Sequence, residues 1–333
     1  MTALLVHLRR VLAASASLAA LGCGTVNVRV PVMKPAEINM APYSSVGVGE
    51  VKYTGNTGGN AAVGGLLEQE LVASNRFQVV DRQRMDAVMR ELQLSASDLS
   101  NPSSATKLGQ QITAGALVFG DVTENYQEQA SEEHTQDKEN KPHTTFKLRG
   151  TANVRCTFKV VDVSTGRLLI SKTYTEKHED THNGYDKKPE AIDRESLLVA
   201  GRNEVVKKFM KAIVPHQEFA NAPFQKDSAL PQLEGGIGWA ERGEWKKAQE
   251  AFNSAIGDAE KNPKIKSEQL AKAYFNLGLS YEYNAEYDKA QKMVEKAHQL
   301  SGNNDYLSEI DSIRQLQADA KKLAEQTAQP GVN

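Results

Sequence analysis

The last third of the chain carries a spacing of small and aromatic residues that is typical of stacked helix pairs. Residues 271–304 span 34 positions and place small residues at Gly278, Ala290 and Ala297, where two helices must approach closely. Larger side chains fill the seam between these helices: Tyr274, Leu277, Tyr281, Tyr287 and Leu300. One such unit cannot bury its apolar face alone, so the pattern predicts at least one neighbouring copy.

A second copy precedes this unit and a further helix follows it. The matching positions upstream are Gly236, Trp239, Gly243, Trp245, Ala248, Phe252 and Ala255. Ala248 and Ala290 are equivalent, and the connection between the copies carries extra residues around Gly257–Lys264. Asp305–Leu323 predicts a capping helix. The pattern resembles the tetratricopeptide repeat, so we expect residues 234–327 to form an all-α module that packs against the preceding domain.

The resemblance to tetratricopeptide repeats implies a concave groove that receives a peptide or a helix of another protein. Groove-facing positions lie on the first helix of each pair, which nominates Asn276, Ser280, Tyr283 and Arg242 as partner contacts. The alternative is that these residues fill the gap against the first domain or the capping helix.

The N-terminus predicts export and lipidation. Basic residues at His7, Arg9 and Arg10 precede the apolar run Val11–Leu21, which is too short to span a membrane. The closing Ala20-Leu21-Gly22-Cys23 resembles a lipobox, so residues 1–22 are a predicted signal peptide and Cys23 the predicted site of a covalent lipid. Residues 23–45 would form a tether with one strand at Val26–Val32. A soluble export signal with an incidental cysteine is the alternative.

Composition excludes two further classes. The 40 basic and 42 acidic residues nearly cancel, so there is no basic footprint for nucleic acid. Besides Cys23 only Cys156 is present, so the fold does not depend on a disulfide framework.

Residues 46–215 alternate between the two kinds of regular structure and predict a mixed α/β sheet with flanking helices. The expected strands are Val46–Tyr53, Phe77–Val80, Ala116–Val122, Val154–Val163 and Arg167–Thr175. The expected helices are Leu66–Ala73, a helix capped by Asp81 and running to Leu92, Thr106–Gln111 and Asp193–Val214. The polar segment 216–233, which contains Pro223, reads as a linker to the helical module.

Three segments of this domain resemble the CsgG family: Phe77–Arg82, Ile112–Asp121 and Val160–Leu169. The family includes the curli-secretion channel lipoprotein and relatives without a pore, such as LpoB-type activators of peptidoglycan synthases. The resemblance implies a lipoprotein on the periplasmic face of the outer membrane and a homo-oligomeric ring. It also implies that the loop from Tyr53 to Gly65, including Asn56, faces the ring axis.

Pore-forming members contribute two apolar hairpin segments per subunit, matching residues 124–149 and 172–196 here. Residues 128–141 contain one alanine and otherwise only polar side chains, and residues 176–188 are equally polar. Charges on a lipid-facing surface cost free energy, so we expect no pore. The expected function is a lipid-anchored scaffold that binds envelope proteins through its helical repeats. The alternatives are an oligomeric curli-type secretion channel and an LpoB-like regulator.

Two motifs imitate catalytic sites. His178-Glu179-Asp180-Thr181-His182 has the letters of a zinc-protease motif, but it follows a β-type run instead of forming a helix. The Gly-rich segment Gly55–Gly65 lacks the Lys-Ser/Thr pair that grips a phosphate. We therefore expect no enzyme, no metal and no cofactor other than the lipid.

Overall fold

The computed structural model describes residues 24–57, 62–80, 82–94 and 114–328, together with positions 98, 104, 107, 108 and 111. The chain divides into two compact units. The sheet unit comprises Met33–Gln217 and Asp319–Asn333, and the helical unit comprises Met1–Val32 and Glu218–Ala318. The predicted signal peptide, Cys23, the Asp81 cap and half of the helix predicted at 106–111 lie outside the described residues.

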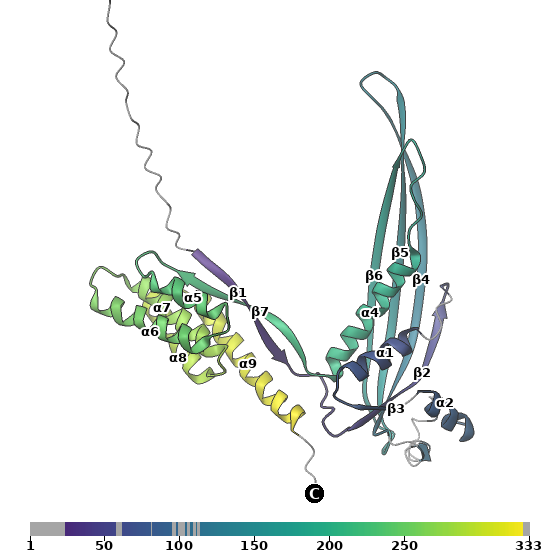
Figure 1. Cartoon of the computed structure of the whole chain (residues 1–333), viewed down its shortest axis with the longest axis horizontal. Coiled ribbons are helices and arrows are strands. Elements are labelled where there is room, and N and C mark those ends of the chain that lie inside the picture. The colour runs from purple at the N-terminus through teal and green to yellow at the C-terminus, as the bar shows by residue number, and fades with distance from the viewer. Residues whose placement is uncertain are drawn as a thin grey trace, which may run out of the picture. The chain divides into compact units, whose positions relative to one another are not determined.

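The sheet unit is built on one five-stranded sheet (Figure 1). Its strands are β2 (Ser45–Gly55), β3 (Gln78–Val80), β4 (Ala116–Gln136), β5 (Pro142–Asp162) and β6 (Leu168–Tyr185), in the order β3-β2-β4-β5-β6. β2 pairs in parallel with β3 and β4, whereas β4, β5 and β6 are antiparallel. A turn at Gly166, whose φ is +68°, joins β5 to β6. The sheet is therefore mixed, as the sequence predicts.

Helices cover both faces of the sheet's base, because successive residues of a strand point to opposite sides. Val118 and Val122 face a core formed with α1 (Ala62–Ala73) and α4 (Arg194–Ile213). Leu117 and Phe119 belong to a second cluster that includes Met89 of α2 (Arg82–Glu91). The Asp193 side chain caps α4 by accepting from the Ser196 amide. Strands that are buried on both faces have continuous apolar runs in their sequence, which explains why the strands at the base of the sheet could be predicted.

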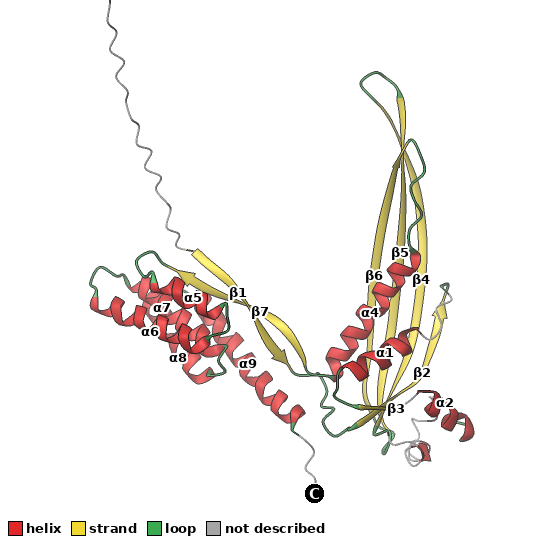
Figure 2. Ribbon diagram, viewed as in Figure 1, coloured by secondary structure: helices red, strands yellow, loops and turns green. Residues whose placement is uncertain are grey.

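The three antiparallel strands extend much farther than the sequence predicts, and we call the extension the arm (Figure 2). β4 and β5 stay in register from Ala116↔Asp162 to Gln136↔Pro142. β2 ends beside Glu124, and residues 127–136 of β4 are all exposed. Predicted strand ends at Val122, Val154 and Thr175 were wrong because the backbone ladder continues where the alternation of apolar side chains stops.

The helical unit contains antiparallel helix pairs. Its helices are α5 (Gln232–Ala240), α6 (Trp245–Lys261), α7 (Ser267–Glu282), α8 (Tyr287–Ser301) and α9 (Asp305–Thr327), the last of which ends in the sheet unit. A Cβ on Gly236 would lie 2.3 Å from the Phe252 ring, and one on Gly278 would lie 2.7 Å from Val294. These two glycines therefore permit the close approach of paired helices that the repeat pattern predicts.

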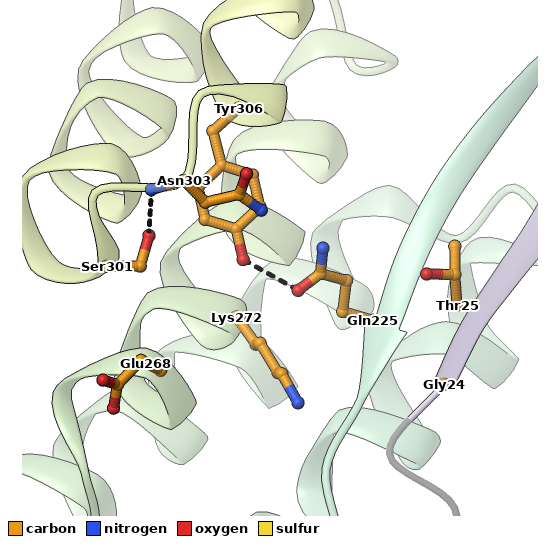
Figure 3. Close-up of a pocket in the computed structure, with 8 residues that line it drawn as sticks. All are labelled: Gly24, Thr25, Gln225, Glu268, Lys272, Ser301, Asn303 and Tyr306. Carbon is orange, nitrogen blue, oxygen red and sulfur yellow. Dashed lines mark hydrogen bonds between the residues drawn. The ribbon is translucent and has the colours of Figure 1, made fainter.

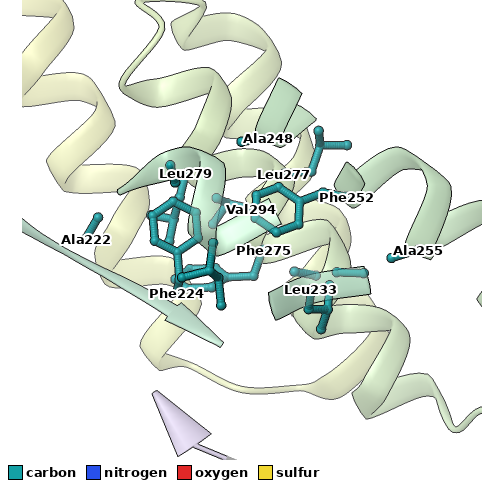
Figure 4. Packing of buried hydrophobic residues seen from close by; sticks show 14 of the residues in the cluster. Ala222, Phe224, Leu233, Ala248, Phe252, Ala255, Phe275, Leu277, Leu279 and Val294 are labelled. Carbon is teal, nitrogen blue, oxygen red and sulfur yellow. The ribbon is translucent and has the colours of Figure 1, made fainter. Parts of the chain in front are cut away.

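The strand predicted at Val26–Val32 within the tether is confirmed, and it is longer than expected: β1 (Gly24–Lys34). The predicted linker, by contrast, is not irregular, because it contains β7 (His216–Lys226). The two strands form a two-stranded sheet. Val28 and Val30 of β1 are buried in the core of the helical unit. Ala222 and Phe224 of β7 belong to the same core (Figure 4). Pro223 suggested a linker, but each strand of a two-stranded sheet is an edge, where proline is tolerated.

The fold class is confirmed: a mixed sheet with flanking helices is followed by a helix-rich region. No helix within the described ranges is long and apolar enough to cross a membrane.

Candidate partner-binding site

The predicted groove contact Asn276 lies against the chain's own strand β7. Its side-chain oxygen accepts from the Gln225 amide at 2.8 Å, and its side-chain nitrogen donates to the Gln225 carbonyl at 2.7 Å. Both hydrogen bonds are made to the backbone of Gln225, so this contact does not depend on the side chain at position 225. Asn276 is fully buried, so the part of α7 expected to receive a partner's peptide is occupied within the molecule.

Polar and aromatic contacts fix the end of β7 in the same place. The Tyr306 hydroxyl donates to the Gln225 side chain at 2.8 Å, and Lys272 of α7 forms an ion pair with Asp227 at 2.8 Å. Burial acts to raise the pKa of Asp227, but hydrogen bonds from Lys272 and Ala229 hold it below its usual value. Phe224 stacks on Phe252 with ring centroids 5.8 Å apart. β7 is thus part of the core and not a loosely bound peptide.

An open pocket of about 400 Å³ remains where β7 ends (Figure 3). Its lining residues contribute amide and hydroxyl groups, one lysine and one glutamate, beside apolar atoms; they are Gly24, Thr25, Gln225, Glu268, Lys272, Ser301, Asn303 and Tyr306. The start of β1, the start of α7 and the turn between α8 and α9 supply these walls. The volume lies within the range of ligand pockets, and the lining can offer hydrogen bonds to a polar peptide.

Two other predicted contacts are engaged inside the unit. Ser280 is fully buried, and its hydroxyl donates to the Leu277 carbonyl at 2.7 Å. Arg242 is exposed, and its guanidinium donates to the Gly238 carbonyl at 2.5 Å. The structure does not bring Ser280, Arg242 and Asn276 together as one exposed surface.

Tyr283, the fourth predicted contact, lies in an acidic and aromatic cluster. Its ring stacks on Trp245 with centroids 5.7 Å apart. Its neighbour Glu282 is 1% exposed, and apart from the nearby Glu309 its carboxyl oxygens have no hydrogen-bond partner in the described part of the chain. Burial and the nearby Glu309 of α9 raise the pKa of Glu282. The sequence signal for this site was weak, because 27 residues separate the two glutamates.

The predicted ring-axis loop of the sheet unit is held by hydrogen bonds between the Asn56 side chain and the backbone of β4. Asn56 accepts from the Tyr126 amide at 2.9 Å and donates to the Tyr126 carbonyl at 3.0 Å. Position 55 requires glycine, because its φ is +131° and a Cβ there would lie 1.9 Å from the Glu124 carbonyl oxygen. Residues 58–61 of this loop lie outside the described residues, and its position in a ring stays a prediction.

A buried ion pair joins β4 to α4 beside the same loop. Arg202 donates to both carboxylate oxygens of Glu124, at 2.7 and 2.8 Å, and Glu124 is fully buried. Tyr53 and Thr57 also donate to this carboxylate. Burial acts to raise the pKa of Glu124, but Arg202 and these hydroxyls hold it below its usual value.

The segment with zinc-protease letters lies on strand β6. His178 and His182 pair with Ala152 and Leu148 of β5. Four residues along a strand span about 13 Å, too far for two histidines to share one ion. Across the described residues, no group of three or more His, Cys, Asp or Glu side chains could hold a metal. Cys156 is buried, and burial raises the pKa of its thiol to about 12.

Residues 41–186 match the family model described as curli production assembly/transport component CsgG. No curated protein sequence matches the chain significantly. The LpoB C-terminal domain from Escherichia coli is 17% identical, covering 42% of this chain and 87% of that one with a TM-score of 0.26. The PelC dodecamer from Paraburkholderia phytofirmans is 12% identical, covering 56% and 98% with a TM-score of 0.23. Lipoprotein GNA1162 from Neisseria meningitidis is 14% identical, covering 49% and 97% with a TM-score of 0.25.

The matched segment runs from the residues before β2 to the end of β6, so it contains the whole five-stranded sheet. The helical unit lies outside the match. Residues 41–186 are therefore similar to the CsgG family, as the sequence motifs suggested.

Proposed function

We propose that this protein is a non-catalytic envelope lipoprotein, anchored through a lipid on Cys23 to the periplasmic face of the outer membrane. It holds a protein partner through the helical unit, whose repeats are of the tetratricopeptide type. The CsgG-like sheet unit serves as an assembly component without a pore of its own.

The polar pocket at the end of β7 is the observation that carries this proposal. Strand β7 occupies the part of α7 around Asn276, and the pocket is lined by Gln225 and the residues near it, where a partner can bind. The pocket offers hydrogen-bonding groups from β1, β7, α7, α8 and α9, and this suits an extended peptide with polar side chains. Because the contact area is small, we expect an affinity in the micromolar class, about −8 kcal/mol.

The composition of the arm supports a role without a pore. Its exposed β4 segment carries Glu128, Glu132 and Glu133, and none of residues 127–136 is buried. Such a surface favours water or a protein partner over lipid.

Crosslinking in intact envelopes tests the pocket. Thr25 and Glu268 are exposed and line it, so Thr25→Arg together with Glu268→Lys should fill it without disturbing the core. Glu250→Lys on the exposed side of α6 is the matched control. We expect the double variant to lose partners that the control retains. Identical sets of crosslinked proteins would refute a partner site in this pocket.

The anchor is tested separately. Cys23→Ser should abolish lipid labelling and release the protein into the soluble periplasmic fraction. Membrane fractionation that does not change would show that another segment anchors the chain.

A further inference from the structure

We propose that Glu282, Glu309, Tyr283 and Trp245 form an acceptor site for an arginine side chain of the protein partner. The inference rests on the proposed function of the helical unit as a partner-binding module. It assigns a ligand chemistry to a second site in that unit, separate from the polar pocket.

The two carboxyl groups lack a counterion. Glu282 is the last residue of α7. It lies close enough to Glu309 of α9 that each carboxyl group shifts the pKa of the other. Apart from the contact with the Glu309 carboxyl group, both oxygens of Glu282 are buried without a hydrogen-bond partner among the described residues, although buried carboxylates are nearly always paired. No lysine, arginine or histidine forms an ion pair with Glu282 in the described part of the chain. Two carboxylates accept and cannot donate, so only a shared proton or a cation can join them.

An aromatic wall lies beside these carboxyls. Tyr283 is the residue after Glu282, and its pKa is raised by burial and then by the charges of Glu282 and Glu309. Its ring stacks on Trp245 with an angle of 30° between the planes. Elsewhere in the unit, aromatic faces already hold cations: Lys247 lies 4.7 Å from the centre of the Trp239 ring, and Lys289 lies 5.3 Å from that of Tyr281.

A guanidinium fits this combination better than an ammonium. Its planar fork can donate to two carboxylates at once while its face stacks on an aromatic ring. Glu309 is only partly buried, which gives an incoming side chain access to the pair. On binding, the carboxyl pair releases its shared proton to solvent and the guanidinium takes its place, so the net charge of the site is conserved.

Peptide titration of the full-length protein tests the site. The probe is the tripeptide acetyl-Ala-Arg-Ala-amide, and acetyl-Ala-Ala-Ala-amide is the uncharged control. Only two tryptophans are present, Trp239 and Trp245, so tryptophan fluorescence reports on the helical unit. Calorimetry in buffers of different ionisation enthalpy measures the proton released. We expect Glu282→Gln to weaken binding of the arginine peptide about tenfold or more, a change of about 1.4 kcal/mol, and to abolish proton release.

The matched control is Glu250→Gln, which changes an exposed carboxylate of α6 and should leave binding unchanged. Equal binding by the wild type and Glu282→Gln, or no binding by the wild type, would overturn the inference. A response to Ca²⁺ but not to the arginine peptide would also overturn it, in favour of a metal site. Failure here leaves the crosslinking result at the polar pocket untouched, so the two proposals can fail separately.

Discussion

Replacing Glu282 with glutamine should stabilise the helical unit, and the gain should depend on pH. Burial and Glu309 raise the pKa of Glu282 well above neutrality, so the folded chain keeps a proton that the unfolded chain releases above about pH 4.3. Each pH unit above that value lowers the free energy of unfolding by about 1.4 kcal/mol until the folded-state pKa is reached. At pH 7.5 the accumulated cost is at most about 4 kcal/mol.

Glutamine removes this cost because its amide needs no proton and can donate to the Glu309 carboxylate. We therefore expect Glu282→Gln to match the wild type near pH 4.3 and to exceed it increasingly up to pH 7.5. Urea unfolding followed by tryptophan fluorescence at several pH values measures the difference, because both tryptophans belong to the helical unit. A variant that is no more stable than the wild type at pH 7.5 would refute the assignment of a protonated buried carboxyl.

Three other predictions concern separate parts of the molecule. Arg202→Met leaves Glu124 buried and unpaired, so it should destabilise the sheet unit by about 3–5 kcal/mol in urea unfolding followed by far-ultraviolet circular dichroism; a loss under about 1 kcal/mol would contradict this. Phe224→Ala should destabilise the helical unit by about 3–5 kcal/mol, whereas Phe219→Ala, whose side chain is 55% exposed, should cost far less; equal losses would mean that β7 is not part of the core. His143 bonds Asp186 at 2.6 Å, which raises the pKa of the imidazole; its titration by nuclear magnetic resonance should therefore shift to lower pH in Asp186→Asn, and an unchanged midpoint would count against that bond.

Close-packing signals were readable from the sequence because they depend on local spacing. Gly236 and Gly278 stand where a side chain would collide with the paired helix, and this requirement occurs in both helix pairs. The apolar runs of β2 and the base of β4 were equally readable, because both faces of these strands are buried.

The features that the sequence did not predict depend on contacts between distant segments. The strand β1 was predicted, but β7 and its pairing with β1 were not, because no local pattern indicates which segments pair and pack on the helices. The arm is held by backbone hydrogen bonds. These need no alternation of apolar side chains, so the outer part of β4 carries no such pattern in its sequence. The sequence predicted Tyr283 as a contact but not its neighbour Glu282, because the raised pKa of Glu282 depends partly on Glu309 of another helix.

The pairing of β1 with β7 has a consequence for how the chain folds. The helical unit is assembled from segments that precede and follow the sheet unit in the sequence, so its first strand is synthesised long before its partners. Until β7 and the helices arrive, the valines at positions 26, 28, 30 and 32 form an unpaired, β-prone segment. Contacts this far apart in sequence form slowly, because the entropy of closing the intervening loop must be lost first. The helical unit should therefore gain its native fluorescence in a late kinetic phase, during which the newly synthesised chain is most exposed to aggregation and proteolysis.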